Sequence, residues 1–225
     1  MSRATTARPP PSPDFTPRVR HMGILAGLAV VALELVYLIV LTIGLTRLPT
    51  PGDPISDPWF TIMEVLILAM VPAFIVLMTA VHAHAGRADK GYSLAALVFM
   101  SMMGLVTACV HFSILTLGRH AAFDGYDLVF AFTWPSVVYA LDILAWDVFF
   151  ALSVLFAAPT FRGSGVTLAV RWALVASGLF ALAGLIGVPT GDMSLRNIGI
   201  LGYAGLMPIA AGLTVILWIR TPAAG

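Results

Sequence analysis

The chain has 225 residues, of which 60% are hydrophobic and only 10% are charged, and its formal net charge is +1. A soluble domain carries about 25% charged residues, so this composition excludes a soluble globular fold and is typical of a polytopic membrane protein. The near balance of 12 basic and 11 acidic residues leaves no basic face for phosphates, which excludes nucleic acid as a partner.

Six apolar runs are long enough to cross a bilayer, since a helix of about 20 residues spans the hydrocarbon. In chain order they cover residues 22–45, 60–82, 92–117, 127–157, 166–188 and 195–219. Turn-forming Pro, Gly, Asp and Ser residues separate them. The pattern predicts an all-α, polytopic membrane helical bundle with six transmembrane helices. Residues 21–221 form its single domain, and residues 1–20, rich in Pro, Arg, Ser and Thr, form a disordered cytoplasmic tail.

The basic residues are divided unequally between the two sides of this bundle. Arg47, Arg119 and Arg196 fall on one side, and the other nine fall on the side of the N-terminus. Basic residues concentrate in cytoplasmic loops, so both termini are expected in the cytoplasm. We expect a multi-pass protein of a bacterial cell membrane, that is, the inner or plasma membrane.

Four acidic residues lie inside the apolar runs: Glu34, Glu64, Asp142 and Asp147. An acid at membrane depth costs at least about 2.5 kcal/mol, so each is a candidate functional residue. Glu34 and Asp142 lie near the midpoints of their helices and are expected at similar depth. Asp147, five residues after Asp142, is expected to point away from it toward a different neighbour.

Glu64 and His111 lie about equally far from the tight turn at residues 85–90. In an antiparallel hairpin they are expected to meet in the outer half of the membrane, in the same layer as Trp134 and Asn197. A Glu–His pair in a low dielectric can handle protons, because desolvation and charge pairing act on it in opposite directions.

Aromatic side chains accompany the acids. Tyr139 and Trp146 share a helix face with Asp142 by their spacing. The predicted catalytic residues are Asp142, Glu34, Glu64 and His111, and the predicted substrate-binding residues are Trp134, Tyr139, Trp146, Tyr37 and Asn197. No histidine or cysteine cluster has metal-ligand spacing and no glycine loop would cradle a phosphate, so neither a metal nor another cofactor is expected.

A buried, protonated carboxylic acid can donate a proton to an olefin or epoxide, and aromatic faces stabilise the resulting cation. In its size, its helical bundle and its intramembrane Glu34, Glu64 and Asp142 beside aromatic residues, the chain resembles the small integral-membrane terpene cyclases of meroterpenoid and indole-terpenoid pathways. The resemblance implies metal-free cyclisation of a prenylated or epoxidised precursor, with Asp142 or Glu34 as proton donor. The stretch 134–142 also resembles segments of bacterial membrane proteins with no assigned function.

Two other functions fit the same residues. In a proton-coupled transporter the acids would bind protons or cations at the midplane. Residues 32–35 (Ala-Leu-Glu-Leu) resemble residues 140–143 (Ala-Leu-Asp-Ile), as inverted repeats would. In a lipid-binding or assembly subunit the acids would only bridge helices. The expected partners are a lipid-soluble small-molecule substrate, membrane lipids and a second copy of the chain in a homo-oligomer.

Overall fold

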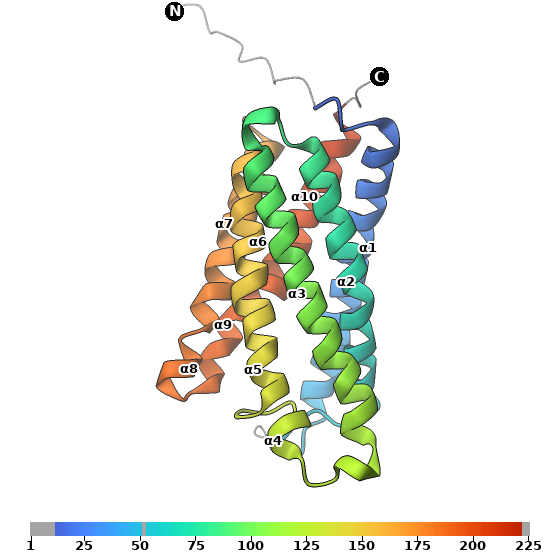
Figure 1. Cartoon of the computed structure of the whole chain (residues 1–225), viewed down its shortest axis with the longest axis vertical. Coiled ribbons are helices and arrows are strands. Elements are labelled where there is room, and N and C mark those ends of the chain that lie inside the picture. The colour runs from blue at the N-terminus through green and yellow to red at the C-terminus, as the bar shows by residue number, and fades with distance from the viewer. Residues whose placement is uncertain (1–11, 51–52, 222–225) are drawn as a thin grey trace, which may run out of the picture.

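The computed structural model of the protein describes residues 12–50 and 53–221, and within them it contains helices and loops but no strand (Figure 1). The α-helices are α1 (Pro17–Thr46), α2 (Trp59–His84), α3 (Lys90–Thr116), α4 (Asp127–Phe130), α5 (Val137–Ile143), α6 (Ala151–Ala157), α7 (Val166–Gly184), α8 (Gly187–Thr190), α9 (Asn197–Ile200) and α10 (Met207–Ile219). Two π-helical segments, Leu144–Phe150 and Leu201–Leu206, join α5 to α6 and α9 to α10. The predicted all-α fold is confirmed.

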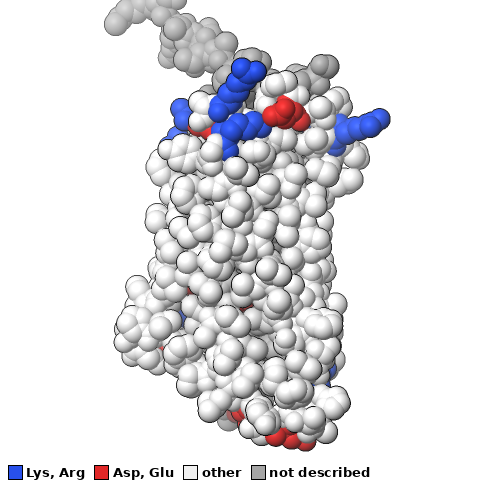
Figure 2. Space-filling model, in the orientation of Figure 1, with Lys and Arg blue, Asp and Glu red and all other residues white. Residues whose placement is uncertain are grey.

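Six helical stretches in the described part of the chain are long and apolar enough to cross a membrane: Pro17–Thr46, Trp59–His84, Arg87–Arg119, Val137–Thr160, Val166–Thr190 and Met193–Ile219. They make the chain a multi-pass membrane protein. Figure 2 shows an almost uncharged belt between two charged ends, with Lys and Arg gathered at the end where α1 begins. That end is called the N-terminal end below, and the opposite end the distal end.

The fourth span starts later than residue 127, where the sequence predicted it. α4 is a single turn, and the loop 131–136 separates it from α5. Pro135 has no N–H to donate and disfavours helical backbone at the preceding Trp134. The Ser136 hydroxyl accepts a hydrogen bond from the Tyr139 N–H (3.2 Å) and so caps α5. The span therefore begins at Val137.

α1 begins at Pro17, inside the range 1–20 that was predicted to be a disordered tail. The preceding residues contact the bundle. Phe15 is fully buried and its ring lies 4.9 Å from that of His84 and 5.4 Å from that of Trp218. The tail prediction is therefore wrong from residue 12 onward, and residues 1–11 of it lie outside the described part of the chain.

The largest fully buried side chains are concentrated in the half of the bundle nearer the N-terminal end. Phe74, Met100, Phe150 and Trp218, from α2, α3, the first π-helical segment and α10, are fully buried there. Large apolar side chains such as Leu25 on the outer surface are exposed, as expected for a surface that faces lipid. The dense packing fills one half of the bundle, and a cavity lies in the other half.

Candidate functional site

A cavity of about 610 Å³ extends from the middle of the bundle to the distal end. Its inner wall includes Met70 and Trp146, and its outer rim includes the loop residues Asp53, Arg119 and Thr133. Ligand sites commonly have volumes of about 300–1,000 Å³, so the cavity is large enough for a drug-sized molecule. Within residues 12–50 and 53–221, none of the residues at the N-terminal end is part of its lining.

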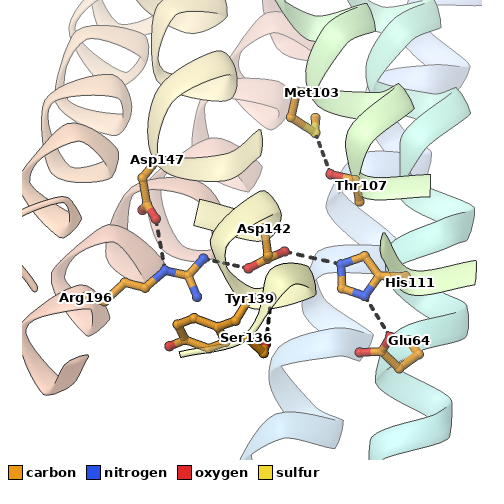
Figure 3. A network of polar contacts seen from close by, with 9 residues as sticks. All are labelled: Glu64, Met103, Thr107, His111, Ser136, Tyr139, Asp142, Asp147 and Arg196. Carbon is orange, nitrogen blue, oxygen red and sulfur yellow. Dashed lines mark hydrogen bonds and ion pairs between the residues drawn. The ribbon is translucent and has the colours of Figure 1, made fainter. Parts of the chain in front are cut away.

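A continuous chain of five ionisable side chains, four of which line this cavity, crosses the bundle (Figure 3). It is called the charge chain below. Glu64 Oε2 lies 2.7 Å from His111 Nδ1, and Asp142 Oδ1 lies 3.3 Å from His111 Nε2 on the opposite side of the imidazole ring. Asp142 Oδ2 accepts a hydrogen bond from Arg196 Nη2 at 2.6 Å, and Arg196 Nε donates to Asp147 Oδ2 at 2.9 Å. The side chains come from α2, α3, α5, the first π-helical segment and the segment before α9.

All five side chains of the charge chain are buried, since the most exposed of them, Arg196, is only 7% exposed. A buried charge is tolerated only when it is paired and hydrogen-bonded, and here each one faces an opposite charge or an imidazole. The planar guanidinium of Arg196 bridges two carboxylates and also lies over the Tyr139 ring, 4.7 Å from its centre. Arginine suits this position because its donors form a rigid fork.

The predicted contact between Glu64 and His111 is confirmed by the 2.7 Å pair. The short connection between α2 and α3 fixes the register of the two helices, so distance from the turn indicates which residues lie opposite each other. The sequence did not predict that the same imidazole also reaches Asp142.

The prediction that Asp147 faces a different neighbour from Asp142 is wrong, because Arg196 contacts both. In an α-helix residues five apart point in well-separated directions. Asp147 instead lies in the π-helical segment Leu144–Phe150, where hydrogen bonds join residues five apart and the turn is wider. Asp147 thereby turns toward the same cation. Its Oδ1 has no hydrogen-bond partner among the described residues.

Eight of the nine predicted site residues line the one cavity: Glu34, Tyr37, Glu64, His111, Tyr139, Asp142, Trp146 and Asn197. Trp134 does not line it. It lies in the loop before α5 and is 39% exposed, and the centre of its ring lies 6.4 Å from that of the Tyr139 ring. The sequence analysis also missed Arg196 and Tyr203, which do line the cavity.

Glu34 differs from the other buried acids. It is 2% exposed and lines the cavity, yet it makes no hydrogen bond or ion pair with any residue in the described part of the chain. Tyr37, one turn further along α1, lines the same cavity, as do Trp146 and Tyr203, whose rings lie 5.1 Å apart. A carboxyl group thus faces an aromatic-lined space without a protein partner.

The rim of the cavity carries a second, more exposed polar group. Arg119 Nη2 donates a hydrogen bond to the Thr61 hydroxyl (2.6 Å) and lies 3.3 Å from a carboxylate oxygen of Asp57. The pKa of Asp57 is held below its ordinary range, chiefly by the hydrogen bond from the Thr61 hydroxyl. Desolvation opposes this shift, and the Thr61 N–H and the Arg119 charge add to it. Arg119 is therefore already paired at the entrance.

Among residues 12–50 and 53–221, no three His, Cys, Asp or Glu side chains are grouped so that they could hold a metal ion. No family model, curated protein or solved structure matches the chain. The function must therefore be inferred from the geometry of the cavity itself.

Proposed function

We propose that this protein is an integral-membrane acid catalyst that protonates a lipid-soluble, isoprenoid-type substrate and closes a ring, as terpene cyclases do. The observation that carries the proposal is the position of Glu34, a buried carboxyl group with no partner among the described residues, on the wall of an aromatic-lined cavity. Such a group avoids the cost of an unpaired buried charge by keeping its proton, which it can then donate.

Glu34 is a better proton donor than Asp142, the other candidate from the sequence. Asp142 lies 2.6 Å from the Arg196 guanidinium and 3.3 Å from His111, and both neighbours favour its charged form. In this proposal Asp142, at the centre of the charge chain, holds His111 and Arg196 in place, and Glu34 supplies the proton.

The proposed reaction balances as an isomerisation. The Glu34 proton forms a C–H bond with the electron pair of an olefin, or protonates an epoxide oxygen whose C–O bond then breaks. A second olefin of the substrate attacks the resulting carbocation and closes a ring. Loss of a proton from carbon to the Glu34 carboxylate forms the final double bond and restores the acid.

Aromatic rings on the cavity wall support the cationic stage of this reaction. Tyr37, Trp146 and Tyr203 all line the cavity that Glu34 faces. A cation over an aromatic face is stabilised by about 0.5–2 kcal/mol, with the larger values in desolvated sites. The apolar part of the lining also suits a hydrocarbon substrate.

The uneven distribution of basic residues supports a cytoplasmic position for the N-terminal end. In that orientation the rim at Asp53, Arg119 and Thr133 opens on the opposite side of the cell membrane. A lipid-soluble substrate would then enter from the outer half of the bilayer.

The test is to express the protein in membranes, supply prenylated and epoxidised terpenoid precursors, and analyse the organic extracts. The wild type should form a cyclised product, and Glu34→Gln, which has the same shape but no acidic proton, should lose it at an unchanged protein level. Asp124→Asn removes an exposed carboxyl group from a distal loop and should leave turnover unchanged. Turnover by Glu34→Gln, or no cyclised product from the wild type, would refute the proposal.

A proton-coupled transporter is the second candidate, because a cavity that opens at one end and stops at midspan is also the form of an outward-open carrier. A transporter must open to the N-terminal end in turn. Cysteine accessibility at Met100, which is fully buried in the dense half, would distinguish the two. If a thiol reagent added from the N-terminal side labels Met100→Cys during turnover, the protein is a transporter. If the introduced cysteine stays unlabelled throughout, the enzyme is favoured.

A further inference from the structure

The buried ionisable groups at and beside the cavity, leaving aside the exposed rim residues, do not balance one another. Four carboxyl groups, those of Glu34, Glu64, Asp142 and Asp147, stand against two basic groups, His111 and Arg196. Even with His111 protonated and Glu34 neutral, one of the other three carboxylates lacks a matching positive charge, and ionisation of Glu34 raises this excess to two. A low-dielectric site with this excess favours positively charged guests and disfavours anions.

Glu34 is the carboxyl group of this excess that faces the cavity without a basic partner among the described residues. The other three carboxylates each contact His111 or Arg196, whereas Glu34 makes no hydrogen bond or ion pair among residues 12–50 and 53–221. It is 2% exposed and on the cavity wall, so a ligand in the cavity is the available counter-ion.

The surroundings of Glu34 fit an organic cation better than a metal ion or a bare ammonium. Tyr37, Trp146 and Tyr203 line the same cavity, and its volume of about 610 Å³ leaves room for a bulky, partly apolar molecule. Aromatic faces combined with a carboxylate are the usual recognition elements for alkylated ammonium groups, which are weakly hydrated and attracted to aromatic rings.

We propose that the cavity is a binding site for hydrophobic organic cations, in which the Glu34 carboxylate pairs with an alkylated ammonium group held among the rings of Tyr37, Trp146 and Tyr203. The inference rests on the proposed function in one respect, since it takes the same cavity as the substrate site. An ammonium ligand there resembles the cation formed during ring closure and therefore inhibits turnover.

The experiment measures binding without turnover, so that the two proposals can fail separately. Purified full-length protein in lipid nanodiscs is titrated with benzyltrimethylammonium by calorimetry, with empty nanodiscs as the blank. Neopentylbenzene, in which carbon replaces the charged nitrogen, is the matched neutral ligand. The variants are Glu34→Gln, Glu34→Asp, Trp146→Phe and the control Asp124→Asn, each first checked for an unchanged thermal transition.

The proposal predicts that benzyltrimethylammonium binds the wild type and Asp124→Asn equally. Loss of a buried charged partner lowers affinity by about thirtyfold or more, which is the effect expected for Glu34→Gln. Glu34→Asp and Trp146→Phe should weaken binding by smaller factors, and neopentylbenzene should show no dependence on Glu34. Equal binding of the cation to wild type and Glu34→Gln, or no binding to the wild type, would overturn the proposal. Cation binding without any cyclised product would refute the enzyme and leave the cation site standing.

Discussion

Replacing Arg196 with methionine tests whether the buried charge chain stabilises the fold. Arg196 is 7% exposed and contacts the carboxylates of Asp142 and Asp147 at 2.6 and 2.9 Å. Methionine keeps most of the apolar volume and removes the charge, which leaves two buried carboxylates without their cation. Removing one partner of a buried ion pair typically costs about 3–5 kcal/mol. That is a large part of the roughly 5–15 kcal/mol by which folded domains are stable.

The free energy of unfolding is measured by denaturant titration of the detergent-solubilised protein, followed by circular dichroism. Arg87→Met, which removes an exposed arginine at the N-terminal end, is the matched control and should change stability by less than about 0.5 kcal/mol. The triple variant Arg196→Met/Asp142→Asn/Asp147→Asn removes the stranded charges and should recover most of the loss. If Arg196→Met matched the control, or if the triple variant recovered nothing, the reasoning about this charge chain would be refuted.

Three further changes have effects that the same unfolding experiment detects. Gly199→Ala places a Cβ atom 2.5 Å from Asp147 Oδ1 and should cost about 1–3 kcal/mol, whereas Gly205→Ala, with nothing within 4 Å, should be tolerated. His111→Leu strands the Glu64 carboxyl group and should cost about 1–3 kcal/mol, part of which His111→Leu/Glu64→Gln restores. The pKa of Asp57 is lowered from its ordinary value of 3.8. The ionised Asp57 carboxylate therefore adds a small amount to the free energy of unfolding above pH 3.8, and this contribution is lost as the pH falls further. Asp57→Asn should remove this part of the pH dependence, and an unchanged acid profile would contradict it.

The membrane fold could be predicted from sequence because its signals are local. Runs of apolar residues longer than a bilayer is thick predict helices. All six predicted spans overlap the observed ones, five of them with only small shifts at their ends. The fourth failed at its start, since apolarity continues through residues 127–136 although α4 ends at Phe130 and the Ser136 cap begins α5 only after Pro135. Hydropathy alone does not detect such a break.

The candidate site was predictable only in part, because its pairings depend on geometry between helices. Glu64 and His111 could be matched by counting from one short turn. Arg196 follows a longer loop and was counted with the basic residues at the membrane surface, although it is buried. Its bridge from Asp142 to Asp147 depends on a π-helical segment, for which the sequence carries no recognised signal.

The proposed role of Glu34 as a proton donor is tested most directly by running the reaction in D₂O with an olefinic, prenylated substrate. The Glu34 proton exchanges with solvent, so the cyclised product of the wild type should carry one deuterium bound to carbon at the site of first protonation. Mass spectrometry and NMR of the extracted product locate that label. A cyclised product without carbon-bound deuterium, or no cyclised product at all, would contradict acid catalysis in this cavity.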